Sequence, residues 1–185
     1  MTQRENDTSM EPGREEQADG NVWLWGSLSR FVAVVALIGL LIDQATKLWL
    51  LHVVDLGMTG PYRVLPVLDI VLVWNRGISY GLFQQDSDLG RWLLVCVTVA
   101  ATLALWVWST RVSDRFVALA LALVIGGALG NGIDRLVYGA VVDFVHFHVG
   151  TFSWYVFNLA DVWIVSGVIG LLIDSFRPGP NSAAK

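Results

Sequence analysis

The fold is decided by the stretch FNLAD at residues 157–161 and by the uncharged apolar run 162–173 that follows it. The run is hydrophobic enough to lie in lipid, and Asp161 directly precedes it. Asp143 has a similar apolar and aromatic setting earlier in the chain. A carboxylate costs about 2.5–3.5 kcal/mol at the bilayer centre and less near the interface, so a chain that keeps one there usually uses it. The rest of the sequence can be interpreted as the frame that holds this pair.

The composition is that of a membrane protein. Hydrophobic residues make up 55% of the 185 residues and charged residues only 15%, with a mean hydropathy of +0.57. Soluble domains average about 25% charged residues. The net charge of −4 is mostly local, because six acidic and two basic residues precede Val22. No run of Lys and Arg suggests a nucleic-acid partner, and this length predicts one domain.

We divide the chain into three parts. Residues 1–22 form an acidic tail with almost no large apolar side chain, which predicts disorder. This tail lacks the basic start and apolar core of a signal peptide. Residues 23–177 form the transmembrane domain, and residues 178–185 form a short C-terminal tail. The single cysteine, Cys96, excludes a disulfide framework.

Four segments are apolar enough to be transmembrane helices, which need about 20 residues to cross the hydrocarbon. They cover residues 28–51, 92–110, 116–133 and 155–176. The connections 53–91 and 136–154 contain β-branched and aromatic runs typical of strands, and residues 83–88 predict a short surface helix. The expected fold class is an all-α membrane protein with four transmembrane helices, a small extracytoplasmic β-rich segment and a short surface helix.

The order of the helices brings the unusual polar residues to one face of the membrane. Seven basic residues lie on the side of the two termini and five on the other, which favours both termini in the cytoplasm. With four spans, the first and third run outward and the second and fourth run inward. The polar residues at the outer helix ends and in the outer connections are Asp43, Asn75, Asn131, Asp134, Arg135, Asp143 and Asp161.

These residues belong to five sequence blocks: DQATK at 43–47, NRGISYG at 75–81, GNGIDR at 130–135, VVDF at 141–144 and FNLAD at 157–161. In this order the blocks resemble the motifs of lipoprotein signal peptidase (signal peptidase II), and the resemblance covers about residues 28–176. The second block departs from the family pattern at residues 78–80, where small residues and Phe are commoner. The resemblance implies a four-helix aspartyl protease of the bacterial cytoplasmic (inner) membrane.

The resemblance also implies the substrate and the site. The substrates would be prolipoproteins, cut just before the lipid-modified (diacylglyceryl) cysteine, at an active site on the extracytoplasmic face. Membrane lipids are the other expected partners, and the chain is expected to be a monomer that needs no cofactor. Asp143 and Asp161 would be the catalytic pair. Six residues would line or support the site: Asp43, Asn75, Asn131, Asp134, Arg135 and Asn158.

Two neighbouring carboxyls suit peptide hydrolysis without a covalent intermediate. One carboxylate activates water while its protonated partner donates to the carbonyl oxygen. Two carboxyls that share a site cannot both ionise readily, so the pair holds one proton near neutral pH. Apolar surroundings act in the same direction, because burial disfavours the charged form.

Structural roles remain open for several of these residues. An aspartate at the start of the last helix could be a cap that meets the helix dipole. Asn158 would share a helix face with Asp161 if the helix already included it. Asp43 could simply pair with Lys47 four residues on, and Arg135 could pair with Asp134 or another acidic neighbour. Polar contacts between helices would account for three of these residues as well as substrate contact would: Asn131, Asp134 and Arg135.

Three alternatives are compatible with parts of the sequence: a zinc site, a proton-coupled transporter and a structural scaffold. His146 and His148 alternate with apolar residues, and with Asp143 they could ligate zinc. There is no HExxH motif and His52 is remote, so we expect no metal. A proton-coupled transporter would also contain buried Asp and Asn residues. Transporters usually bind their substrate at the midplane between internal repeats, and this sequence has neither a repeat nor midplane charges. A structural scaffold would leave the clustering of the aspartates unexplained.

Overall fold

The computed structural model describes residues 24–77 and 88–177. The acidic tail at 1–22 and the C-terminal tail at 178–185 lie outside these residues. The surface helix expected at 83–88 also lies outside them, except for Asp88, which begins a long helix instead.

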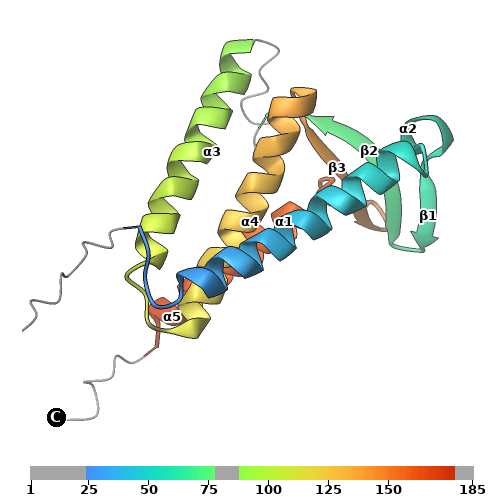
Figure 1. Cartoon of the computed structure of the whole chain (residues 1–185). Coiled ribbons are helices and arrows are strands. Elements are labelled where there is room, and N and C mark those ends of the chain that lie inside the picture. Colours follow the sequence, from blue (N-terminus) through green and yellow to red (C-terminus); the bar gives the residue numbers. More distant parts are fainter. Residues whose placement is uncertain (1–23, 78–87, 178–185) are drawn as a thin grey trace, which may run out of the picture.

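Four long helices form the body of the molecule. They are α1 (Ser29–His52), α3 (Asp88–Ser109), α4 (Arg115–Tyr138) and α5 (Leu159–Ser175). A one-turn helix, α2 (Leu56–Thr59), follows α1. Helix α4 is central, because it packs against α1, α3 and α5, and Figure 1 shows it between α3 and α1.

Among the helices in the described part of the chain, three are long and apolar enough to cross a membrane: α1, α3 and α4. Helix α5 is apolar too but has 17 residues, which correspond to about 26 Å at 1.5 Å per residue. The start expected for it at residue 155 is wrong, because Asn158 caps the helix and Leu159 is its first residue. Phe157 instead forms an antiparallel bridge with Val145. Helix α4 is longer than expected and ends where Gly139 adopts a φ of 75°, a conformation that favours glycine.

The connections predicted to be strand-rich form one antiparallel sheet of order β1-β2-β3-β4. The strands are β1 (Tyr62–Leu65), β2 (Leu68–Asn75), β3 (Val141–Val149) and β4 (Phe152–Ser153). They gather at one end of the molecule, beyond the C-terminal half of α1 (Figure 1). The chain is therefore mainly helical with a four-stranded sheet, which is more β structure than an all-α class implies.

Small residues let the helices approach closely enough for polar side chains to meet. A Cβ at Gly126 would lie 2.7 Å from the carbonyl oxygen of Ala36 in α1. A Cβ at Gly127 would collide with the carbonyl oxygen of Ala160 in α5. Both glycines lie in α4, so this helix contacts the backbone of two neighbours at one level, as small residues allow in membrane helix packing.

Candidate active site

The two predicted catalytic aspartates are joined through one side chain, that of Asn158. Asp143 lies in β3 opposite Val73 and is 1% exposed, and Asp161 lies in the first turn of α5. The amide nitrogen of Asn158 donates to Asp143 Oδ1 at 2.6 Å. Its amide oxygen accepts from the backbone nitrogen of Asp161 at 2.9 Å. The side chain of Asn158 thus holds the Asp143 carboxyl of the strand next to the first turn of α5, which carries Asp161.

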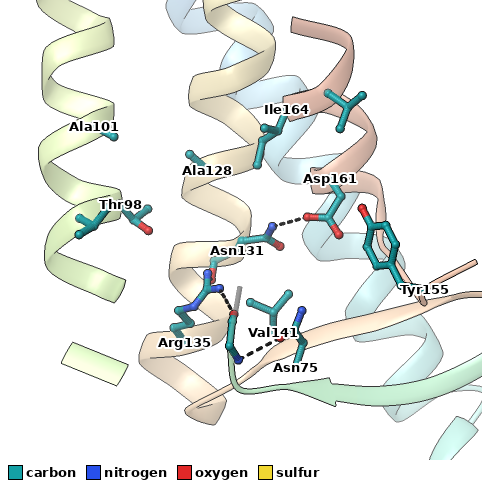
Figure 2. Close-up of a pocket in the computed structure, with 13 residues that line it drawn as sticks. Asn75, Thr98, Ala101, Ala128, Asn131, Arg135, Val141, Tyr155, Asp161 and Ile164 are labelled. Carbon is teal, nitrogen blue, oxygen red and sulfur yellow. Dashed lines mark hydrogen bonds between the residues drawn. The ribbon is translucent and has the colours of Figure 1, made fainter. Parts of the chain in front are cut away.

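Asp161 is both a helix cap and a site residue. Its Oδ2 accepts from the backbone nitrogen of Asn158 at 3.3 Å, which completes a capping box. The alternative that an aspartate serves as the cap is confirmed only in part, because Asn158 is the N-cap and Asp161 is the N3 residue of its capping box. Its Oδ1 accepts from Asn131 Nδ2 of α4 at 2.8 Å, and Figure 2 shows this bond across the site. Capping uses one carboxylate oxygen and leaves the other for contacts outside the helix.

Asp161 borders two hollows. A cavity of 290 Å³ between α3, α4, α5 and the end of β2 is lined by Asp161, Asn75, Asn131 and Arg135, among others (Figure 2). A second cavity of 230 Å³ is lined by Asp161 and by the aromatic residues Trp154, Tyr155 and Phe157. Asp143 lines neither of these two cavities. One carboxyl thus faces open space while the other is covered.

Asn75 supplies the second amide contact of Asp143. It is the last residue of β2 and pairs with Val141 of β3. Its Nδ2 donates to Asp143 Oδ2 at 3.1 Å, while its Oδ1 accepts from the backbone nitrogen of Gly77 at 3.0 Å. The contact with Gly77 fixes the amide orientation, so that the donating nitrogen faces the carboxylate. Both oxygens of Asp143 therefore accept from asparagine amides.

Burial raises the pKa of the Asp143 carboxyl to about 7, and the negative charge of Asp161 acts in the same direction. Hydrogen bonds from Asn75 and Asn158 and the positive charge of Lys47 lower this pKa and partly offset the increase. A carboxyl that titrates near neutral pH can serve as a proton donor or acceptor under physiological conditions.

Three further predicted site residues, Asp43, Asp134 and Arg135, are held by ion pairs or hydrogen bonds. Asp43 and Asp134 are fully buried, and both form ion pairs with Lys47, at 2.8 and 2.7 Å. The pairing of Asp43 with Lys47 is thus confirmed, whereas the alternative of an Arg135–Asp134 pair is wrong. Arg135 donates instead to the carbonyl oxygens of Gly77 at 3.0 Å and Asn131 at 3.3 Å. All eight predicted residues lie in one connected region.

The two histidines lie beside Asp69 and not beside the predicted catalytic aspartates. His148 Nε2 lies 3.1 Å from Asp69 Oδ2, and the His146 and His148 rings are 5.3 Å apart on one strand face. Their carboxylate neighbour is Asp69 rather than Asp143, because residue 143 has the opposite parity along β3. Within residues 24–77 and 88–177, no group of three His, Cys, Asp or Glu side chains is arranged to hold a metal ion.

Sequence reasoning left out three residues that the structure adds to the site. Lys47 and Gln44 contact the buried carboxylates, and Tyr155 lines both cavities. The signal for Lys47 was available, since a lysine within an apolar helix needs a buried partner. Gln44 gave a weaker signal of the same kind, since an amide within an apolar helix also needs a polar partner, but the sequence does not show that this partner is Asp134.

Comparison with known proteins agrees with this arrangement. The sequence model of signal peptidase (SPase) II matches residues 35–177. A lipoprotein signal peptidase of Methylorubrum extorquens is 58% identical over 83% of this chain and 89% of its own length. A lipoprotein signal peptidase of Nitrobacter hamburgensis is 54% identical over 82% and 94%, respectively.

A solved bacterial membrane enzyme superposes with a TM-score of 0.73 at 26% identity, over 84% of this chain and 93% of that one. Sequence and fold thus agree over nearly the whole described region. The chain belongs to the signal peptidase II family of bacterial membrane proteases.

Proposed function

We propose that this chain is a membrane-embedded aspartyl endopeptidase that removes signal peptides from prolipoproteins, cutting just before the lipid-modified cysteine. The observation that carries the proposal is the Asn158 side chain, which joins the Asp143 carboxyl to the backbone of Asp161. Asn158 contacts Asp143 at 2.6 Å and the Asp161 backbone at 2.9 Å. Membership of the signal peptidase II family gives the substrate class.

The chemistry follows from the unequal surroundings of the two aspartates. Asp161 borders the cavity, so its carboxylate can hold and deprotonate the attacking water. Asp143 is covered in the free enzyme and has a pKa of about 7, so it keeps a proton. Once a bound substrate reaches this carboxyl, it can donate that proton to the scissile carbonyl oxygen. Below this pH the pair holds one proton, and above it both carboxyls ionise and the donor is lost. The amides of Asn75, Asn131 and Asn158 orient the carboxyls and do not titrate.

The two hollows beside Asp161 fit the two parts of such a substrate. The cavity lined by asparagine and arginine side chains suits the peptide backbone around the cleaved bond. The cavity lined by Trp154, Tyr155 and Phe157 suits the apolar side chains and lipid next to that bond. Aromatic side chains at membrane interfaces combine an apolar body with a polar edge.

We further propose that α5 is a fourth span, which brings both termini to the cytoplasm. Its 17 residues are close to the lower limit of about 17 for a transmembrane helix. Arg177 beyond its end lies 3.3 Å from Asp114 at the start of α4. The ends that carry Arg30, Arg115 and Arg177 would then face the cytoplasm, and the aspartates and the sheet would face outward. The proposed active unit is a monomer, because the eight predicted residues lie in one connected region within a single chain.

The test is cleavage of a lipid-modified prolipoprotein by the purified enzyme, with the product mass giving the position of the cut. We expect one cut immediately before the modified cysteine. The matched substrate with serine at that position cannot be lipidated and should not be cleaved. A chelator should leave the rate unchanged. Equal cleavage of both substrates would contradict the proposed specificity, and loss of activity with chelator would contradict the metal-free mechanism.

A further inference from the structure

Lys47 is the least expected residue in this region. Its side chain is 1% exposed, and its ammonium contacts Asp43 at 2.8 Å and Asp134 at 2.7 Å. Its third contact is Asn131 Oδ1 at 3.2 Å. An ammonium has three donors and no acceptor, so these three contacts use its full capacity. A buried charge is tolerated only when it is paired in this way.

Each carboxylate that Lys47 contacts also holds the backbone directly beside a catalytic aspartate. Asp43 Oδ1 accepts from the backbone nitrogen of Ala160 at 3.0 Å, one residue before Asp161. Asp134 Oδ2 accepts from the backbone nitrogen of Val142 at 3.1 Å, one residue before Asp143. The ammonium therefore links the start of α5 to the start of β3, through α1 and α4.

The third contact orients an amide of the site itself. With Asn131 Oδ1 accepting from Lys47 at 3.2 Å and from Asn158 Nδ2 at 3.1 Å, the Nδ2 of Asn131 is directed to Asp161 at 2.8 Å. A flipped Asn131 would place its NH₂ group against the ammonium and leave Asp161 without this donor. Lys47 thus determines which end of the amide faces the carboxylate.

We propose that Lys47 is a positioning residue for peptide hydrolysis, whose ammonium sets the spacing of Asp143 and Asp161 through Asp43, Asp134 and Asn131. The inference rests on the proposed function, since it concerns the same dyad. Lys47 does not touch the substrate in this account. It acts because its buried, fully paired ammonium in α1 connects, directly or through Asp43 and Asp134, to α4, α5 and β3, which are far apart in sequence. Gln44 reinforces it by donating to Asp134 Oδ1 at 2.9 Å.

The charges around the dyad give this role a signature. Four carboxyls and two cations meet in the region, namely Asp43, Asp134, Asp143, Asp161, Lys47 and Arg135. The positive charge of Lys47 lowers the pKa of Asp143. Removal of that charge should therefore move the alkaline limb of the pH–rate profile to higher pH, which a merely structural residue would not do.

The test is Lys47→Met in the full-length enzyme, assayed by cleavage of lipid-modified prolipoprotein. Misplacement of reacting groups by about 1 Å costs about 100-fold, so we expect kcat to fall by about that factor, KM to stay within about threefold and the alkaline limb to shift upward. Arg177→Met is the matched control, because it deletes a cation from an exposed ion pair that is remote from the dyad. We expect wild-type kcat and an unshifted profile for this control.

A second variant separates positioning from charge balance. The triple variant Asp43→Asn, Lys47→Met, Asp134→Asn leaves no unpaired charge where the Lys47 ion pairs were, so it should fold even if Lys47→Met does not. We expect its kcat to remain low, because the shared donor is still missing. Wild-type kcat in this variant would overturn the proposal. Wild-type cleavage by folded Lys47→Met would also overturn it while leaving the proposed function intact, whereas a wild-type enzyme without cleavage would refute both.

Discussion

Asn75 controls how readily Asp143 loses its proton, and this can be tested by Asn75→Leu. The asparagine amide donates to Asp143 Oδ2 at 3.1 Å and lowers the pKa of that carboxyl from what burial alone would give. Leucine has a similar volume but no donor. A hydrogen bond to a charged group contributes about 1.5–3 kcal/mol, which corresponds to about 1–2 pH units at 1.36 kcal/mol each.

The direction of the pKa shift depends on which form of Asp143 the hydrogen bond stabilises. Asn75 stabilises ionised Asp143, so its loss favours the protonated form and raises the pKa from about 7. Because the proposed reaction needs one proton on the pair, the variant should retain activity to higher pH, with the alkaline limb of its pH–rate profile moved up by about 1–2 units. The assay is kcat for prolipoprotein cleavage measured across the pH range in detergent.

Thr46→Val is the control for this experiment. Its hydroxyl donates to the Ile42 carbonyl oxygen within α1 at 2.8 Å, so its removal should leave the profile in place. An unshifted alkaline limb in folded Asn75→Leu would refute the reasoning. A shift to lower pH would also refute it, since that would mean that the amide favours the protonated carboxyl.

Three further predictions concern stability and the cap. Gly127→Ala should lower the melting temperature, because its Cβ collides with the Ala160 carbonyl and overpacking costs about 1–3 kcal/mol; Gly57→Ala, whose Cβ would lie 3.5 Å from a leucine methyl, should change it little. Asn158→Ala should destabilise the protein by about 1 kcal/mol through the lost cap and reduce kcat far more than that loss explains. Asp143→Asn should gain in melting temperature relative to wild type between pH 5 and pH 8, because the raised pKa makes folded wild type lose stability as that carboxyl ionises. A melting-temperature difference between Asp143→Asn and wild type that is the same at pH 5 and at pH 8 would contradict the burial of Asp143.

Local pattern was enough for the helices, and together with the family resemblance it singled out the two aspartates whose catalytic role stays a prediction. The uncharged runs gave α1, α3 and α4 within a few residues, apart from the end of α4, where the expected end fell short of Gly139. The β-branched connections gave the sheet. Asp143 and Asp161 were recognisable because a carboxylate in an apolar setting needs a reason. These are properties that neighbours in sequence determine.

Contacts between distant elements could not be derived in the same way. Asp43 and Lys47 are visible as a pair four residues apart, but Asp134 and Asn131 join them from another helix. The start of α5 was misplaced because Phe157 pairs with Val145 of β3, and this bridge competes with helix formation. The histidines were associated with the wrong aspartate, since Asp69 meets them only through strand pairing.

The most direct measurement is the single-turnover rate of prolipoprotein cleavage by wild type, Asp143→Asn and Asp161→Asn, with matched folding checked by thermal melts. General acid–base catalysis contributes about 10²–10⁴-fold, so each variant should lose at least that factor. Their combination should lose little more, because the two carboxyls act as one unit. Retention of the wild-type rate by either folded variant would remove that aspartate from the pair and contradict the mechanism.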